Sequence, residues 1–158
     1  MQAFRIRQFG SADVLRGESI PMPEPGHVEA RVKIEAAGIN FIDVYQRTGQ
    51  YRGELPFTLG VEGAGVVDKV ALGVTEVKPG DRVAFASHPG SYAEYATVSA
   101  WKLVPIPNGV SMQQAAAVML QGMTAHYLTH STYPLQPGDT ALLHAAAGGV
   151  GLLLVQIA

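Results

Sequence analysis

Cysteine is absent from this sequence of 158 residues. Its absence excludes disulfide bonds and any metal site that depends on thiolate ligands. It also fits a reducing compartment, in which disulfide bonds are rare. We therefore expect a cytoplasmic protein.

Long apolar runs and clustered charges are lacking as well. No stretch reaches the ~18 consecutive apolar residues of a membrane-spanning helix, and the segment Met1–Arg7 has no apolar core of signal-peptide length. The 11 basic and 13 acidic residues give a net charge of −2, whereas a nucleic-acid surface requires clustered lysine and arginine. Membrane and nucleic-acid partners are therefore not expected.

The first two thirds of the sequence contain many short stretches in which apolar and polar residues alternate. Val28–Ile39 is the clearest, and its pattern predicts a strand of an antiparallel sheet with one solvated face. Phe4 and Ile6 alternate with arginines, which predicts a half-buried strand over Ala3–Gln8. Short strands separated by turn residues are typical of a β-barrel or sandwich.

A short helix is predicted after the Val28–Ile39 strand. Asn40 is suited to cap its N-terminus, and Gly49 is suited to end it. Phe41, Val44 and Tyr45 share one face of this helix.

A second helical region follows residue 110. Ser111 and Gln114 have the spacing of a capping box, and Met112–Leu120 is rich in good helix formers. Gly122 is expected to break or bend the helix, and Met123–His130 resumes a helical pattern.

The last part of the sequence has the order strand, glycine turn, helix. Ala141–Leu143 is a short uncharged run, as expected of a strand buried on both faces. Ala146, Gly148 and Gly151 occupy the three small positions of G-x-G-x-x-G, a turn that brings the backbone close to a pyrophosphate. The N-terminus of the following helix favours negative phosphate charge. A tight turn without a ligand is the alternative interpretation.

Only the first strand and helix of a dinucleotide-binding domain are present before the sequence ends at Ala158. The residue that selects NAD or NADP normally lies about 20 residues past the glycines. We expect one domain over residues 1–122 and the start of a truncated nucleotide-binding domain over residues 123–158. Leu142–Ala158 is then expected to pair with another chain or to pack abnormally, and residues 1–158 alone are expected to bind NADPH very weakly and to be inactive.

Five stretches, in the same order along the chain, resemble the medium-chain dehydrogenase/reductase superfamily, and more narrowly its zinc-free quinone oxidoreductase branch, which includes zeta-crystallin. They are Ala36–Asp43, Leu59–Gly65, Val77–Val83, Val104–Pro107 and His144–Gly151. The resemblance implies a mixed β and α/β fold, in which a GroES-like β-barrel catalytic domain precedes a Rossmann domain. It also implies a chain about twice this length, and a homodimer when full length.

The same resemblance separates the zinc-dependent from the zinc-free members. Zinc alcohol dehydrogenases have a cysteine ligand where this sequence has Asn40, and a histidine ligand where it has Val61. Asparagine and valine cannot replace a thiolate and an imidazole on Zn²⁺. The resemblance therefore implies an enzyme without a metal, in which NADPH performs the redox chemistry.

The resemblance also supplies candidate site residues. It implies that Asn40, Phe41 and Tyr45 line the cleft near the nicotinamide, and that Thr124 contacts the cofactor. The glycine turn would hold the pyrophosphate through Ala146, Gly148, Gly149, Val150 and Gly151.

Tyr45 and Tyr51 are the candidates for holding a flat quinone, since a tyrosine can stack on the ring and hydrogen-bond its carbonyl oxygen. The alternatives are a core role for Tyr45 and an exposed loop position for Tyr51. His126 and His130 have the spacing of a metal motif, but Tyr127 replaces its glutamate. We expect these histidines to lie at the surface.

These observations predict an NADPH-dependent quinone reductase that acts on a quinone or another small electrophilic acceptor. Two alternatives remain at this point. One is a reductase of 2-enoyl thioesters or enones from the same superfamily. The other is a non-catalytic protein, either a crystallin-like structural protein or an RNA-binding one, although the near-neutral charge gives RNA binding little support.

Overall fold

The computed structural model describes all residues from 1 to 158. They form two compact units, Met1–Ala117 and Val118–Ala158. The division falls inside α2 (Met112–His126), and the domain boundary expected at residues 122 and 123 lies in the same helix. No helix combines the length and the apolar character that crossing a membrane requires.

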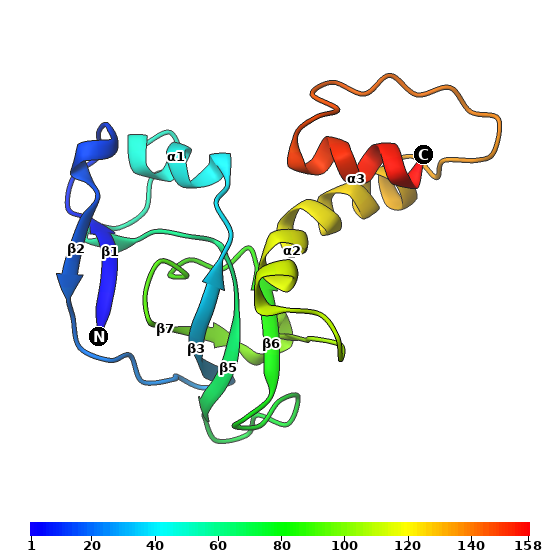
Figure 1. The fold of residues 1–158 in the computed structure, drawn as a ribbon. Helices are drawn as coiled ribbons and strands as arrows, with labels where there is room; N and C mark the ends of the chain where they lie inside the picture. Colours follow the sequence, from blue (N-terminus) through cyan, green and yellow to red (C-terminus); the bar gives the residue numbers. More distant parts are fainter. The chain divides into compact units, whose positions relative to one another are not determined.

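The first unit consists mainly of two antiparallel sheets (Figure 1). A three-stranded sheet has the order β2-β1-β4, and a five-stranded sheet has the order β7-β3-β5-β6-β8. The strands are β1 (Gln2–Ile6), β2 (Arg16–Ser19), β3 (Glu29–Ala37), β4 (Phe57–Thr58), β5 (Glu62–Val70), β6 (Arg82–Ala86), β7 (Tyr95–Ser99) and β8 (Val104–Pro105). The antiparallel, strand-rich architecture predicted from the alternating stretches is confirmed.

The remaining elements are helical. The helices are η1 (Ala12–Val14), α1 (Phe41–Thr48), η2 (Ala100–Lys102), α2, the π-helix η3 (Tyr127–Thr132) and α3 (Gly149–Ile157). The capping box predicted for α2 forms, because the Ser111 amide donates to Gln114 Oε1 at 2.9 Å and the Gln114 amide donates to Ser111 Oγ at 3.2 Å.

Residues 91–94 join the two sheets of the first unit. The amide of Phe4 in β1 donates to the Tyr92 carbonyl at 2.7 Å, and the amide of Ile34 in β3 donates to the Glu94 carbonyl at 2.9 Å. A segment far along the sequence thus lies between the first strand and β3. This placement brings Tyr92 within hydrogen-bond distance of Asp43 in α1.

The core of the first unit lies on one face of the five-stranded sheet. Its members are mostly β-branched or small, which suits a tightly pleated surface; they are Ala30, Val32, Val67, Val77, Val83, Phe85, Ala96, Val98 and Leu103. Ala30 and Val32 belong to the apolar face predicted for β3. At Gly65 a Cβ atom would collide with the Lys33 carbonyl, so glycine allows β3 and β5 to approach closely.

The alternation predicted for the first strand is wrong. Phe4 is 54% exposed, whereas Ala3 is buried together with Ile6. Ala3 forms an isolated bridge with Ala93, so the small residue faces the joining segment and the aromatic ring is left outside. The strand also ends at Ile6, two residues before the predicted end.

A proline-rich segment between β2 and β3 is held to the first unit by charged groups. The Glu24 carboxylate pairs with Lys69 at 2.6 Å and with Arg31 at 3.0 Å. The Arg31 guanidinium also donates to the Pro23 carbonyl at 3.1 Å and pairs with Asp68 at 2.6 Å. The segment thus depends on ionic contacts to β3 and β5.

In the second unit, α3 lies against the second half of α2 (Figure 1). Of the break or bend predicted at Gly122, the break does not occur, because α2 continues through it to His126. One glycine costs a helix only about 1 kcal/mol, and its neighbours are good helix formers. A Cβ at Gly122 would lie 3.2 Å from Val118 of the same helix and at an ordinary contact distance of 4.0 Å from Leu153 of α3. The helical pattern predicted for Met123–His130 continues α2 to His126, and beyond it the chain winds as a π-helix.

The strand predicted over Ala141–Leu143 does not form. Residues 140–143 have no strand partner, and Leu142 is 86% exposed. A strand depends on a hydrogen-bonded neighbour, and a local apolar run cannot provide one. The glycine turn and the helix that follow it do form, as predicted.

Candidate functional site

The N-terminus of α1 is fixed by a capping interaction. The backbone amide of Asn40 donates to Asp43 Oδ2 at 2.8 Å, which closes the first turn of the helix. Gly49 ends the helix with a φ of 84°, a conformation that glycine adopts without steric cost. The predicted bounds of this helix are therefore confirmed.

A second carboxylate, that of Glu62 in β5, contacts the same asparagine. Glu62 has no exposed surface, and its Oε2 accepts a hydrogen bond from Asn40 Nδ2 at 2.9 Å. The Gly38 amide donates to the Glu62 carbonyl at 3.0 Å. A Cβ at Gly38 would collide with the Glu62 carboxylate, so glycine at this position leaves space for a buried acid.

Tyr92 binds the carboxylate of Asp43. Its phenol donates to Asp43 Oδ2 at 2.8 Å, and Asp43 is itself buried. Burial, the hydrogen bond to Asp43 and the negative charges of Asp43 and Glu62 together raise the pKa of Tyr92 well above its ordinary value. The phenol therefore remains a proton donor at neutral pH.

This shift predicts a loss of stability at alkaline pH. A raised pKa in the folded state stabilises the protein fully below the ordinary tyrosine pKa of about 10, and this contribution is lost as the pH rises above it. We thus expect the wild type to have a larger free energy of unfolding than Tyr92→Phe. The difference between the two is expected to be constant below about pH 10 and to shrink above it. Urea unfolding of both proteins at several pH values measures this difference, and a difference that grows with alkaline pH contradicts it.

The aromatic residues of this region are exposed rather than part of the core. Phe41 is 79% exposed, and Tyr45 is 39% exposed. The alternative that Tyr45 is a core residue is therefore wrong. The Tyr45 and Tyr51 rings lie edge to face with centroids 5.7 Å apart, and the Tyr51 amide donates to the Tyr45 carbonyl at 3.1 Å. The loop thus places both tyrosines in one exposed pair.

The glycine turn of the second unit is tight. Ala145 has a φ of 52°, in a region that residues with a side chain rarely adopt, and the Gly148 amide donates to its carbonyl at 2.8 Å. A Cβ at Gly151 would collide with the Ala145 carbonyl and lie 2.6 Å from Ala146 Cα. The first turn of α3 therefore packs directly on the turn backbone.

The N-terminus of α3 suits an anion. Its first amides, on Gly149, Val150 and Gly151, precede the first hydrogen bond within the helix, in which the Leu152 amide donates to Gly148 at 2.8 Å. The first turn has no acidic residue that would repel a phosphate. A pyrophosphate therefore fits the residues present.

Thr124 lies in α2, in the second unit. Its hydroxyl donates to the Leu120 carbonyl of the same helix at 2.7 Å. A hydroxyl oxygen that donates in this way can still accept a hydrogen bond. Thr124 therefore keeps an acceptor to offer to a ligand.

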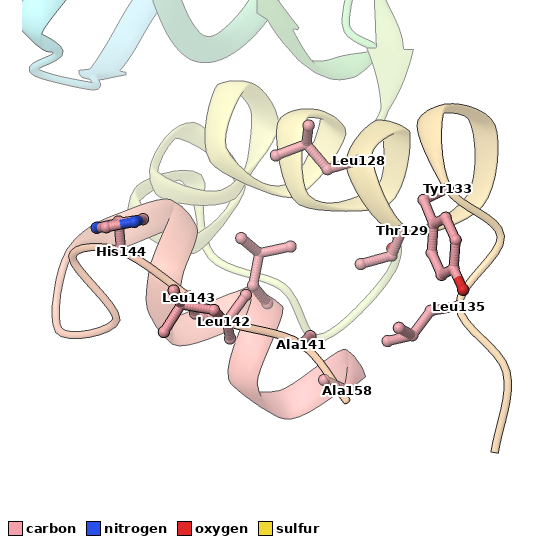
Figure 2. A pocket seen from close by; sticks show the side chains of 10 residues that line it. Leu128, Thr129, Tyr133, Leu135, Ala141, Leu142, Leu143, His144 and Ala158 are labelled. Carbon is pink, nitrogen blue, oxygen red and sulfur yellow. The ribbon is translucent and has the colours of Figure 1, made fainter. Parts of the chain in front are cut away.

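The side chains of the expected strand line an apolar pocket of about 290 Å³ in the second unit (Figure 2). Ala141, Leu142 and Leu143 meet Leu128 of the π-helix and Leu154 of α3 there. His144 lies at the edge of this group.

No group of three or more histidine, cysteine, aspartate or glutamate side chains is placed to hold a metal ion. Asn40 instead bonds to Glu62, and Val61 is buried. The His126 and His130 rings stack with centroids 4.0 Å apart along one helical face.

Sequence reasoning missed the contributions of Glu62, Asp43 and Tyr92. The position of Asp43 in the first turn of a predicted helix indicates only a favourable interaction with the helix dipole. The sequence signal for Glu62 is that it is the only acid within the glycine-rich apolar stretch Gly60–Val67, where an exposed side chain is unusual.

Known proteins match this arrangement. Residues 26–108 match the model of the alcohol dehydrogenase GroES-like domain, which is more than half of the chain. The chain belongs to this family. The GroES-like fold expected for the first domain is therefore confirmed.

Quinone oxidoreductases are prominent among the relatives of this GroES-like chain. The quinone oxidoreductase of Pseudomonas aeruginosa is 49% identical over 150 residues, which cover 94% of this chain and 46% of that protein. The chain thus spans about half the length of the curated relatives it matches. The resemblance to quinone oxidoreductases that the motifs indicated is confirmed.

Two solved structures share nearly all of its backbone. The Escherichia coli quinone oxidoreductase complexed with NADPH is 40% identical with a TM-score of 0.96, over 99% of this chain and 49% of that one. A mycobacterial protein complexed with NADPH is 48% identical with the same TM-score, over 99% of this chain and 49% of its own.

Proposed function

We propose that this chain provides the quinone-reducing part of an NADPH-dependent quinone oxidoreductase. The likeness to the Escherichia coli quinone oxidoreductase complexed with NADPH, which extends over 99% of the chain, carries this proposal. When bound, NADPH supplies the hydride for the reduction. The residues of this chain bind and orient the reactants.

In the second unit, the glycine turn holds the pyrophosphate of NADPH. Ala146 and Gly148 keep the turn backbone free of bulk, and the first amides of α3, from Gly149 to Gly151, donate to the phosphate oxygens. Gly151 is required because its first-turn position packs on the Ala145 carbonyl. Thr124 offers its hydroxyl as a further cofactor contact.

In the first unit, the start of α1 contacts the nicotinamide through Asn40, Phe41 and Tyr45. The exposure of Phe41 supports this role, because an aromatic ring that is largely uncovered in its own unit is available to a planar ligand. The capped N-terminus of α1 holds these residues on a rigid element.

Tyr45 and Tyr51 hold the quinone. Their edge-to-face pair presents ring surface for stacking and two phenol hydroxyls for the quinone oxygens. A quinone is already a good electron acceptor, so orientation by these side chains is the contribution that the protein makes.

Steady-state assays of the complete gene product test the proposed activity. We expect oxidation of NADPH, followed by loss of its absorbance, with a 1,4-naphthoquinone as acceptor and much slower oxidation with an enoyl thioester. Failure to oxidise NADPH with any quinone overturns the proposal. Preferential turnover of the enoyl thioester favours the enone reductase alternative instead.

Replacing Tyr51 by alanine tests the aromatic pair. Loss of one ring of a stacking site is expected to raise the KM for the quinone about two- to tenfold, with the KM for NADPH unchanged. Initial rates at several quinone concentrations measure the effect. Tyr133→Ala, which removes an equally exposed tyrosine in the second unit, serves as the matched control, and an equal rise in KM for both variants contradicts the assignment.

A further inference from the structure

Two buried carboxylates converge on one residue, Asn40. Asp43 binds its backbone amide at 2.8 Å, and Glu62 binds its side-chain amide at 2.9 Å. Burying a carboxylate is costly unless its hydrogen bonds repay the lost hydration. The capping box uses the Asn40 backbone amide and, as an acceptor, the Asn40 side chain, so the donation from Asn40 Nδ2 to Glu62 is additional to the cap.

The surrounding sequence accommodates Glu62 closely. Gly38 lacks the Cβ that would collide with the carboxylate. The Gly38 amide also donates to the Glu62 backbone carbonyl, which holds the end of β3 against the start of β5. Both the side chain and the backbone of Glu62 are therefore placed by Gly38 and Asn40, which lie between the end of β3 and the start of α1.

The chemistry of this contact decides the orientation of the Asn40 amide. A carboxylate accepts hydrogen bonds but does not donate them, so the NH₂ group of Asn40 must face Glu62. An asparagine without such a neighbour can present either of its two ends. With NH₂ engaged by Glu62, the carbonyl oxygen Oδ1 is left to accept: it takes the Asp43 backbone amide in the capping box and keeps a second lone pair to offer to a ligand.

We propose that Glu62 is a positioning residue, which fixes the Asn40 amide so that its oxygen accepts a hydrogen bond from the carboxamide NH₂ of the nicotinamide. This inference rests on the proposed function, in which Asn40 contacts that ring. Glu62 itself touches no ligand. It acts through Asn40. Asp43 binds the backbone amide of Asn40, and Tyr92 in turn binds the carboxylate of Asp43.

An NADPH analogue tests this inference in the complete gene product. The reduced 3-acetylpyridine analogue replaces the carboxamide by an acetyl group and so lacks the NH₂ donor. The wild type is expected to bind NADPH about tenfold more tightly than this analogue, because the analogue cannot donate a hydrogen bond to Oδ1. Equal affinity of the wild type for the two ligands overturns the proposal without any variant.

Glu62→Gln provides the second comparison. Glutamine can donate as well as accept, so the Asn40 amide is no longer held in one orientation. We expect the variant to bind NADPH about tenfold more weakly and to distinguish NADPH from the acetylpyridine analogue poorly. Glu76→Gln, which changes an exposed glutamate in the same unit, is the matched control and is expected to behave as the wild type does.

Adenosine 2′,5′-bisphosphate separates this inference from its alternatives. It carries no nicotinamide, so its dissociation constant, measured by calorimetry, is expected to be the same for the wild type and for Glu62→Gln. An equal loss of affinity for this probe and for NADPH means that Glu62 has a structural role alone. A wild type that binds neither ligand refutes the proposed function instead.

Discussion

Replacing Gly151 by alanine is expected to lower kcat/KM for NADPH by about a hundredfold or more, the effect of misplacing a bound reactant by about 1 Å. The added Cβ would collide with the Ala145 carbonyl and crowd Ala146 Cα. Both are backbone atoms, which cannot rotate aside as the end of a side chain can. The turn and the first turn of α3 must therefore separate, and the amides that face the pyrophosphate move with them.

Initial rates of NADPH oxidation by the complete gene product measure this loss. Gly17→Ala is the matched control, because its Cβ would be 3.7 Å from Phe4, an ordinary contact distance. Circular dichroism of both variants shows whether the helices persist. A Gly151→Ala protein that keeps most of its activity contradicts the assignment of the glycine turn.

Replacing Phe85 by alanine is expected to destabilise the first unit by about 3–5 kcal/mol. Phe85 is fully buried at the centre of the core, where its ring packs among β-branched side chains from four strands. Removing the ring forfeits its burial and leaves a cavity that the surrounding strands cannot fill. Since domains are stable by only about 5–15 kcal/mol, this single change brings the unit close to unfolding.

Phe4→Ala is the natural control for this experiment. The same atoms are removed, but Phe4 is more than half exposed, so we expect a loss below about 1 kcal/mol. Urea unfolding followed by circular dichroism gives both values. Similar losses for the two variants would mean that the core does not lie on this face of the sheet.

Features set by near neighbours along the chain could be predicted from the sequence. Asn40 and Gly49 mark the ends of α1 because a cap and a left-handed stop depend on a few adjacent residues. The capping box at Ser111 formed for the same reason. The long alternation of β3 also identified its buried face correctly at Ala30 and Val32.

Features that depend on distant partners could not be predicted in this way. The run Ala141–Leu143 has the composition of a buried strand, but composition does not supply a neighbouring strand. Phe4 was expected to face the core, and only the bridge between Ala3 and Ala93 shows why it does not. Gly122 looked like a helix break, yet α3 packs beside it.

The candidate site shows the same division. The glycine turn is a local motif, and it forms where the sequence indicated. The contact between Asp43 and Tyr92 joins residues 49 positions apart, and the contact between Asn40 and Glu62 joins residues 22 positions apart. Sheet topology creates both contacts, and no spacing rule along the sequence points to them.

The proline-rich segment before β3 has a consequence for how the first unit responds to its solvent. Glu24, which holds it to Lys69 and Arg31, is largely exposed, so dissolved ions compete directly for these contacts. The apolar core feels no such competition. We therefore expect that, at raised ionic strength, a protease cleaves this proline-rich segment early, while the sheets of the first unit stay intact.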